Sequence, residues 1–210
     1  MNPLDVALGP CIHIVDDEVA IRHALAFLMQ SHDMPFAAYE DGEVFLRQLD
    51  AQPLMRGVVL LDVRMSPISG LEVHDQLIAR HCRMPVIFLS GHGDIPMAVR
   101  AVNNGALDFI EKPFDPDGLL GRLNKALSLE ADRHQSQQAQ SQLRTVILGL
   151  SDRELSVMRM VALGKLNKVI ANELGISMRT VEVHRAKVYE KLGVRSGAEV
   201  ATLLVQFESV

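Results

Sequence analysis

The pattern of apolar and polar positions changes character along the chain. In roughly the first 130 residues, short runs of aliphatic residues bounded by turn residues predict buried strands. Apolar residues at helical spacing separate these runs, and the alternation predicts βαβ units around a parallel, doubly wound sheet. The five predicted strands span residues 11–15, 35–39, 58–61, 85–90 and 107–111.

Beyond residue 148 the periodicity is helical only. Ser151 and Glu154 form a capping-box pattern at the first of four short predicted helices. Two of these, 168–174 and 178–192, have the spacing of a helix-turn-helix. Residues 131–147 are polar and rich in Gln, which predicts a linker or an extension of the preceding helix. We therefore expect an α/β domain over 8–130, a linker over 131–147 and an all-α four-helix domain over 148–210.

Charge also divides the chain. Residues 1–150 carry a net −7 and residues 151–210 a net +2, which together make the −5 of the chain. The basic excess is too small to establish nucleic-acid binding by itself. Cys11 and Cys82 have no metal-site or disulfide spacing, and no apolar run approaches the ~18 residues of a membrane span. We expect a cytoplasmic protein with reduced thiols and no membrane partner.

Polar side chains follow four of the five predicted strands. In a flavodoxin-like sheet of order 2-1-3-4-5, the carboxyl ends of these strands meet at one edge. Clustered carboxylates repel one another unless they are protonated or bound to a metal, and a hard divalent ion such as Mg²⁺ suits oxygen ligands. A carboxylate there could attack a phosphoryl donor while an ammonium and a hydroxyl bind its oxygens. Singly, each group could cap a helix, form a turn or be a surface charge; together they favour phosphoryl chemistry. The groups are Asp16, Asp17, Asp62, Ser90 and Lys112.

These motifs identify a family resemblance over residues 10–130. Asp16-Asp17, Asp62 with Met65, Ser90-Gly91 and Lys112-Pro113 resemble a response-regulator receiver domain, and the runs 91–101 and 108–114 are similar to its FixJ branch. The resemblance implies that a histidine kinase phosphorylates Asp62 and that the Lys112-Pro113 bond is cis. It further implies that Phe109 is a switch aromatic that responds with Ser90.

The same resemblance implies Mg²⁺ (or Mn²⁺) as the cofactor. Its ligands would be Asp17, Asp62 and the backbone carbonyl of Arg64, with Asp16 acting through water. One departure stands out, because the family usually has proline directly after the Met65 position, whereas this chain has Ser66-Pro67. Proline restricts the residue before it, so we expect this loop to differ in shape and the phosphorylation kinetics to differ with it.

In the predicted helix 178–192, a helical projection turns Val181, Val188 and Leu192 inward. The outward and flanking residues, together with the start of the preceding helix, suit a major groove and its phosphates. A solvated face of mixed charge is the alternative on charge alone. The run from Asn167 to Arg185 resembles a LuxR/NarL-type helix-turn-helix, with a match over 148–208. The candidate contacts are Lys165, Asn167, Lys168, Arg179, Thr180, Glu182, Val183, His184, Ala186 and Lys187.

Both resemblances together predict a two-component response regulator that is not an enzyme. Phosphorylation of Asp62 would promote a receiver homodimer, two tail domains would bind a double-stranded DNA operator, and RNA polymerase would be a further partner. A Mg²⁺-dependent phosphatase is one alternative, but it needs a second carboxylate close after its nucleophile, where this chain has Arg64. A phosphorylation-independent scaffold is another, and the complete set of polar residues argues against it.

Overall fold

The computed structural model describes residues 9–91 and 95–208, so the part of the predicted loop at residues 92–94 lies outside the described residues. The chain divides after Arg133 into two compact units. The single long helix α5 (Pro116–Leu148) contributes residues to both units.

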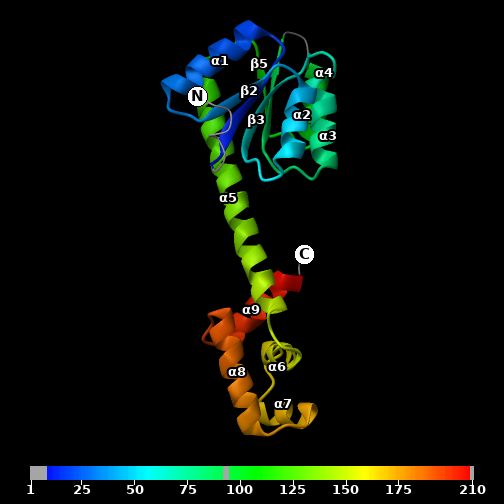
Figure 1. Ribbon diagram of the computed structural model, residues 1–210, viewed down its shortest axis with the longest axis vertical. Helices are drawn as coiled ribbons and strands as arrows, with labels where there is room; N and C mark the ends of the chain where they lie inside the picture. The colour runs from blue at the N-terminus through cyan, green and yellow to red at the C-terminus, as the bar shows by residue number, and fades with distance from the viewer. Residues whose placement is uncertain (1–8, 92–94, 209–210) are drawn as a thin grey trace. The chain divides into compact units, whose positions relative to one another are not determined.

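The first unit has the predicted sheet. Its five strands are parallel and lie in the order β2-β1-β3-β4-β5 (Figure 1). The strand boundaries agree with the apolar runs to within one residue. The strands are β1 (Cys11–Val15), β2 (Phe36–Tyr39), β3 (Gly57–Asp62), β4 (Val86–Ser90) and β5 (Asp108–Glu111).

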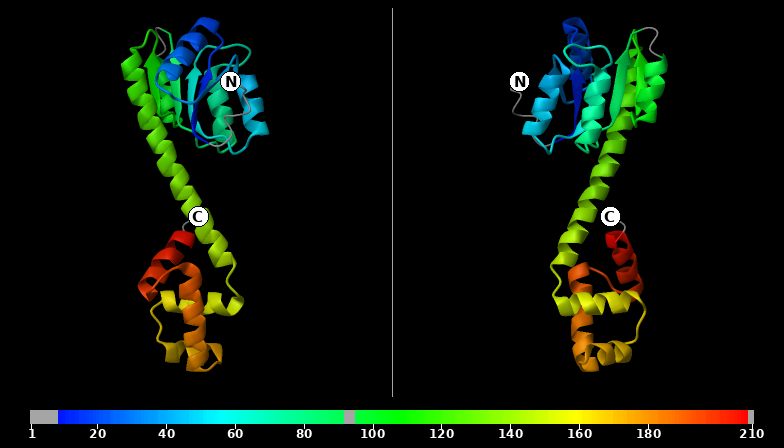
Figure 2. Two further views of the ribbon diagram at one scale, coloured as in Figure 1. Left: turned by 60° about the vertical axis from the view of Figure 1, so that its left-hand side comes forward. Right: turned by 90° about the vertical axis from the view of Figure 1, so that its right-hand side faces the viewer.

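Helices cover both faces of this sheet, as the views in Figures 1 and 2 show. On one face α2, α3 and α4 bury residues such as Phe45, Val73 and Ala101. On the other face α1 and α5 bury residues such as Leu25 and Leu123. The strands are therefore apolar on both sides, which is typical of a parallel sheet. The helices are α1 (Val19–Ser31), α2 (Gly42–Ala51), α3 (Gly70–Ala79) and α4 (Ile95–Asn103).

The stretch 131–147 is helical throughout. Of the two alternatives for this segment, the structure has the helix extension, since these residues belong to α5. No Gly or Pro occurs between Arg122 and Leu148, so nothing in the sequence stops the helix. Glu130 is anchored to the first unit by a two-pronged ion pair with Arg56, at 2.9 and 3.1 Å. Further along, Ile147 packs into the core of the second unit.

The second unit contains the four predicted helices around an aliphatic core. The predicted capping box is present, because the Ser151 hydroxyl accepts from the Glu154 amide while the Glu154 carboxylate accepts from the Ser151 amide. Gly175 and Gly193 adopt left-handed backbone angles after their helices, where glycine is favoured. No helix in the described ranges is long and apolar enough to cross a membrane. The helices are α6 (Asp152–Ala162), α7 (Asn167–Leu174), α8 (Met178–Leu192) and α9 (Gly197–Glu208).

Candidate functional site

Two carboxylates and an ammonium meet at the carboxyl ends of β1, β3 and β5. The Lys112 ammonium lies between Asp16 and Asp62, 2.8 Å from Asp16 Oδ2 and 2.6 Å from Asp62 Oδ1. The exposed Glu18 adds a third carboxylate at 3.6 Å. Because these residues come from strands that pair directly or through β4, the sheet register fixes their positions. The prediction that polar residues after parallel strands meet at one end of the sheet is therefore confirmed for Asp16, Asp62 and Lys112.

Burial gives this cluster its electrostatic character. Asp16 is fully buried and the Asp62 side chain is 7% exposed. Burial raises the pKa of Asp62, and the hydrogen bond from Lys112 only partly opposes that rise. Burial alone would lower the pKa of Lys112, but its bonds to the two carboxylates outweigh this and raise it. Lys112 therefore stays cationic and serves as the counter-ion that two buried carboxylates need.

The remaining predicted ligands lie at the same edge. The Arg64 amide donates to Asp62 Oδ2 at 2.8 Å, and the exposed Asp17 accepts from the Ser66 amide at 3.3 Å. Among the described residues, no three acidic, His or Cys side chains converge on one point as metal ligands do. The donor set nevertheless fits Mg²⁺, because it consists of hard carboxylate oxygens beside a buried negative charge. Lys112 occupies the place between Asp16 and Asp62 where their charges are neutralised.

The two predicted switch residues lie on neighbouring strands. Ser90 is buried, and its hydroxyl donates to the Gly91 carbonyl at 2.9 Å. Phe109 is half-buried and packs against Phe88, with 6.2 Å between ring centroids. Phe88 stands two residues before Ser90 on the same face of β4, so the three side chains share one side of the sheet.

The loop after Asp62 has a defined backbone. Both Lys112-Pro113, as expected, and Ser66-Pro67 are cis. The loop returns to the sheet at Gly70, whose amide donates to the Val63 carbonyl at 3.0 Å. A Cβ atom on Gly70 would overlap the backbone carbonyl oxygen of Asp62. The start of α3 therefore packs directly against the backbone of the candidate acceptor residue.

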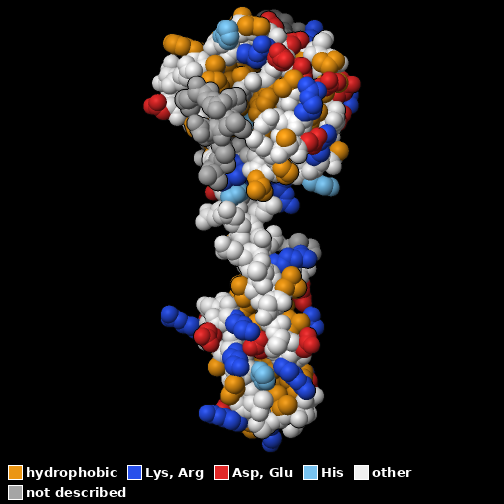
Figure 3. All heavy atoms as spheres, viewed as in Figure 1, with side chains coloured by type: hydrophobic (Ala, Val, Ile, Leu, Met, Phe, Trp, Pro, Cys, Tyr) orange, Lys and Arg blue, Asp and Glu red, His pale blue; other side chains and the backbone are white. Residues whose placement is uncertain are grey.

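The face of α8 follows the predicted projection. Val181 and Val188 are fully buried, and Leu192 packs against the same core. The remaining candidate residues lie away from this stripe, and charges of both signs intersperse over the surface of the second unit seen in Figure 3. Arg179 is highly exposed and lies 3.5 Å from Glu182 on the next turn. The exposed set is Arg179, Glu182, Val183, Ala186 and Lys187, and the half-buried set is Thr180 and His184.

The three predicted residues at the start of α7 differ in their contacts. Lys165 is paired with Glu173 at 2.6 and 2.8 Å, and the Asn167 amide oxygen accepts from Arg185 at 2.6 Å. Lys168 is exposed. Arg185 links α8 to α7 through this bond to Asn167, and it also donates to the hydroxyl of Tyr189 on its own helix at 2.7 Å.

The comparisons with known proteins agree with this geometry. Residues 12–124 match the response regulator receiver domain, and residues 148–204 match the bacterial regulatory proteins of the luxR family. The chain is 42% identical to the transcriptional regulatory protein FixJ of Azorhizobium caulinodans over 193 residues, which are 91% of this chain and 90% of FixJ. It is also 42% identical to the response regulator protein TmoT of Ectopseudomonas mendocina, over 88% of this chain and 83% of TmoT. The solved structure of the response regulator StyR matches with a TM-score of 0.87 at 37% identity, covering 95% of this chain and all of StyR.

Proposed function

Because the chain belongs to the family of two-component response regulators that join a receiver domain to a LuxR-type DNA-binding domain, we propose that Asp62 is its phosphoryl acceptor. The observation that carries this proposal is the position of Lys112 between Asp16 and Asp62. A buried carboxylate held by one ammonium is a nucleophile with its counter-charge already in place.

The residues around Asp62 suit the transfer step. A carboxylate oxygen of Asp62 attacks the phosphorus atom of the donor's phosphoryl group, and the donor leaves with the electrons of the broken bond. Lys112 then neutralises a phosphoryl oxygen, and the Ser90 hydroxyl turns from the Gly91 carbonyl to donate to another. Asp16, Asp17, Asp62 and the Arg64 carbonyl would hold Mg²⁺ (or Mn²⁺), which neutralises charge on the phosphoryl oxygens when bound.

Asp62→Asn is the direct test of the acceptor. With acetyl phosphate and Mg²⁺, the full chain should gain one phosphoryl group by intact-mass spectrometry, and the variant should gain none. Asp50→Asn is the matched control, since Asp50 is an exposed carboxylate at the end of α2 that pairs with Arg80. It should be labelled like the unaltered protein. Undiminished labelling of Asp62→Asn would exclude Asp62 as the acceptor.

The output of this switch is proposed to be DNA binding in the cytoplasm. A cognate histidine kinase supplies the phosphoryl group, and the chain itself has no further catalytic role. The outward face of α8 enters the major groove, while Lys168 and its neighbours contact phosphates. Support comes from the exposed small and polar side chains on that face and from the buried stripe behind it. RNA polymerase is the expected further partner at the promoter.

Phosphorylation is proposed to make the receiver form a homodimer through the rearrangement of Ser90 and Phe109. Sedimentation velocity of the full chain, with and without beryllofluoride as a phosphoryl mimic, should show the dimer only with the mimic. Identical profiles would exclude dimerisation as the switch.

A further inference from the structure

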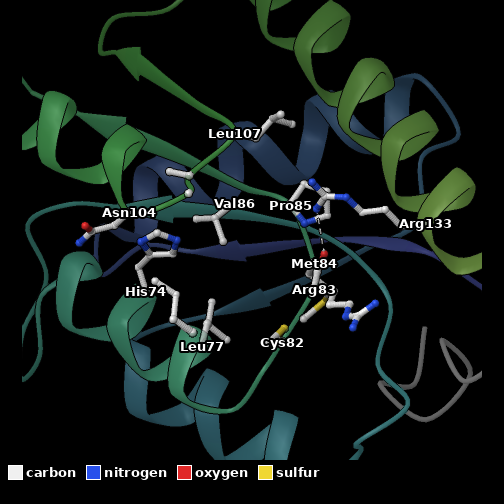
Figure 4. Close-up of a pocket in the computed structure, with 13 residues that line it drawn as sticks. His74, Leu77, Cys82, Arg83, Met84, Pro85, Val86, Asn104, Leu107 and Arg133 are labelled. Atoms are coloured by element: carbon white, nitrogen blue, oxygen red, sulfur yellow. Dashed lines mark hydrogen bonds between the residues drawn. The ribbon is translucent and has the colours of Figure 1, made fainter. Parts of the chain in front are cut away.

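A cavity of about 330 Å³ lies at the amino-terminal ends of β4 and β5, on the edge of the sheet opposite to Asp62. Its walls come from the second half of α3, the segment before β4, the turn after α4 and Arg133 of α5 (Figure 4). All of these residues belong to the first unit. The volume falls at the small end of the range for small-molecule sites, about 300–1,000 Å³.

His74 is the buried polar group of this cavity. The residue is 4% exposed and lines the cavity, and no described residue forms a hydrogen bond with its imidazole. Its ring nitrogens are not among the fully enclosed, unpartnered atoms of the described residues, so the imidazole remains open to the cavity that it lines. Burial lowers the pKa of His74, so the ring is neutral and offers one N–H donor and one acceptor. A ligand with a polar atom at this end of the cavity could hydrogen-bond to the imidazole.

Two arginines give the cavity its charge. Arg83 and Arg133 are both exposed lining residues, and the lining contains no Asp or Glu. Arg133 uses one N–H on the Arg83 carbonyl, at a long 3.4 Å, and its guanidinium keeps further donors. Figure 4 shows Arg133 reaching over Pro85 on one side of the cavity, while His74 and Asn104 lie on the other. This rim favours an anion, because guanidinium donors match a carboxylate.

The wall between these polar ends is apolar. Val86 lies between them in Figure 4, and Leu77 and Leu107 also line the cavity. We propose that this cavity binds a small organic carboxylate that carries a second, uncharged hydrogen-bonding group. The carboxylate contacts Arg133, the short hydrocarbon body packs on Val86 and Leu107, and the second group meets His74. Inorganic phosphate offers the charge but has no body that spans the cavity.

The site would also communicate with the switch. The His74 ring meets Phe88 edge-on at 5.4 Å between centroids, and Phe88 packs against Phe109. A ligand that holds His74 in one orientation therefore biases the packing of Phe109. Because coupling between two sites is reciprocal, phosphorylation changes the affinity for the carboxylate. This second part rests on the proposed function of Asp62, whereas the binding site does not.

Levulinate, which has a carboxylate and a ketone, is a suitable probe. The full chain labelled with ¹⁵N is titrated while its eight histidine side chains are observed by NMR, with His74 assigned from a His74→Gln variant. We expect a saturable shift of the His74 imidazole signals. Methyl levulinate lacks the charge, pentanoate lacks the ketone, and each should bind about fivefold more weakly, which corresponds to roughly 1 kcal/mol.

Arg133→Gln should weaken levulinate binding by a similar factor, about fivefold. Arg144→Gln is the matched control, because Arg144 is an exposed arginine on the same helix that does not line the cavity. A shift that does not saturate, or one that is equal for the methyl ester and in Arg133→Gln, would overturn the site. For the coupling, affinity should change after treatment with acetyl phosphate and Mg²⁺ but not in Asp62→Asn. Equal affinities before and after labelling would overturn the coupling and leave the site intact.

Discussion

The candidate phosphoryl-acceptor site and the candidate DNA-contact surface are built on opposite principles. At the edge of the sheet, residues 96 and 50 positions apart in sequence contact each other directly, and buried strands hold them there. On α8, the candidate residues are neighbours on one exposed helix, and their charged side chains pair locally, as Arg179 does with Glu182. The first site is therefore preorganised before any ligand arrives. The second offers a surface whose charges water and salt screen until a polyanion replaces them.

Removing the ammonium at the sheet edge should give the largest effect. Lys112→Met leaves the buried Asp16 and Asp62 without their counter-ion, so the free energy of unfolding of the first unit should fall by about 3 kcal/mol without Mg²⁺. Millimolar Mg²⁺ should restore part of the loss, because it supplies the missing charge. Hydrogen exchange of the β1 and β3 amides in urea, with and without Mg²⁺, measures both the loss of stability and its recovery.

Lys125→Met is the matched control, since Lys125 is an exposed lysine on α5. It should leave the stability of the first unit unchanged. If the loss in Lys112→Met were insensitive to Mg²⁺, the view of Lys112 as a resident counter-ion in the metal site would be wrong.

A smaller effect is expected at Glu154, a strongly perturbed carboxylate of the second unit. Glu154 has a side chain that is 6% exposed and lies 2.7 Å from the Lys191 ammonium. The hydrogen bond from Lys191 and that from the Ser151 amide lower its pKa from 4.5 to about 2. Its contribution to stability is therefore fully present above about pH 4.5 and is lost as the pH falls towards 2.

Glu154→Gln should lower the free energy of unfolding of this unit by about 2 kcal/mol at neutral pH. The difference from the unaltered chain should shrink as the pH falls below 4.5. Urea unfolding followed by exchange of the α6 and α8 amides, between neutral pH and pH 3, tests this. Glu190→Gln, an exposed glutamate on α8, should show no such pH-dependent difference. If the difference in unfolding free energy between Glu154→Gln and the unaltered chain did not change with pH, the negative charge of Glu154 would not be what stabilises the start of α6.

The smallest expected effect is a change in DNA affinity and in its salt dependence, and it should be larger for Lys168 than for Lys165. Lys168 is exposed, so Lys168→Ala should weaken binding to DNA of any sequence about fivefold at low salt and reduce the salt slope by about 0.9. Lys165 is held by Glu173, so Lys165→Ala should change the slope less. Fluorescence anisotropy with duplex DNA across a salt series measures both, with Lys125→Ala as the control outside the domain. An unchanged slope in Lys168→Ala would remove it from the phosphate contacts.

The contrast between the sites also decides what could be foreseen. The sheet order and the grouping of Asp16, Asp62 and Lys112 followed from the sequence, because parallel strands bring their carboxyl ends to one edge. The inward stripe of α8 followed from helical periodicity alone. In both cases a strongly constrained backbone fixes the direction of each side chain.

What could not be foreseen depends on long side chains and on competing local preferences. Nothing in the sequence pattern says that Lys165 turns to Glu173, or that Arg185 rather than a phosphate engages the Asn167 amide. Whether residues 131–147 continue the helix depended on a balance between polar composition and helix propensity. The cavity beside His74 is formed by the stretch 74–86, the stretch 104–107 and Arg133, and no motif marks it.

Gly70 has a consequence for how this protein can diversify. Any side chain at that position would collide with the Asp62 backbone, so substitution there displaces the residue that is proposed to carry the phosphoryl group. We therefore expect Gly70 to resist substitution more than the loop positions between Arg64 and Ser69, which include the Ser66-Pro67 order. Related proteins that differ in the lifetime of the phosphorylated state would then differ at these loop positions and keep glycine at position 70.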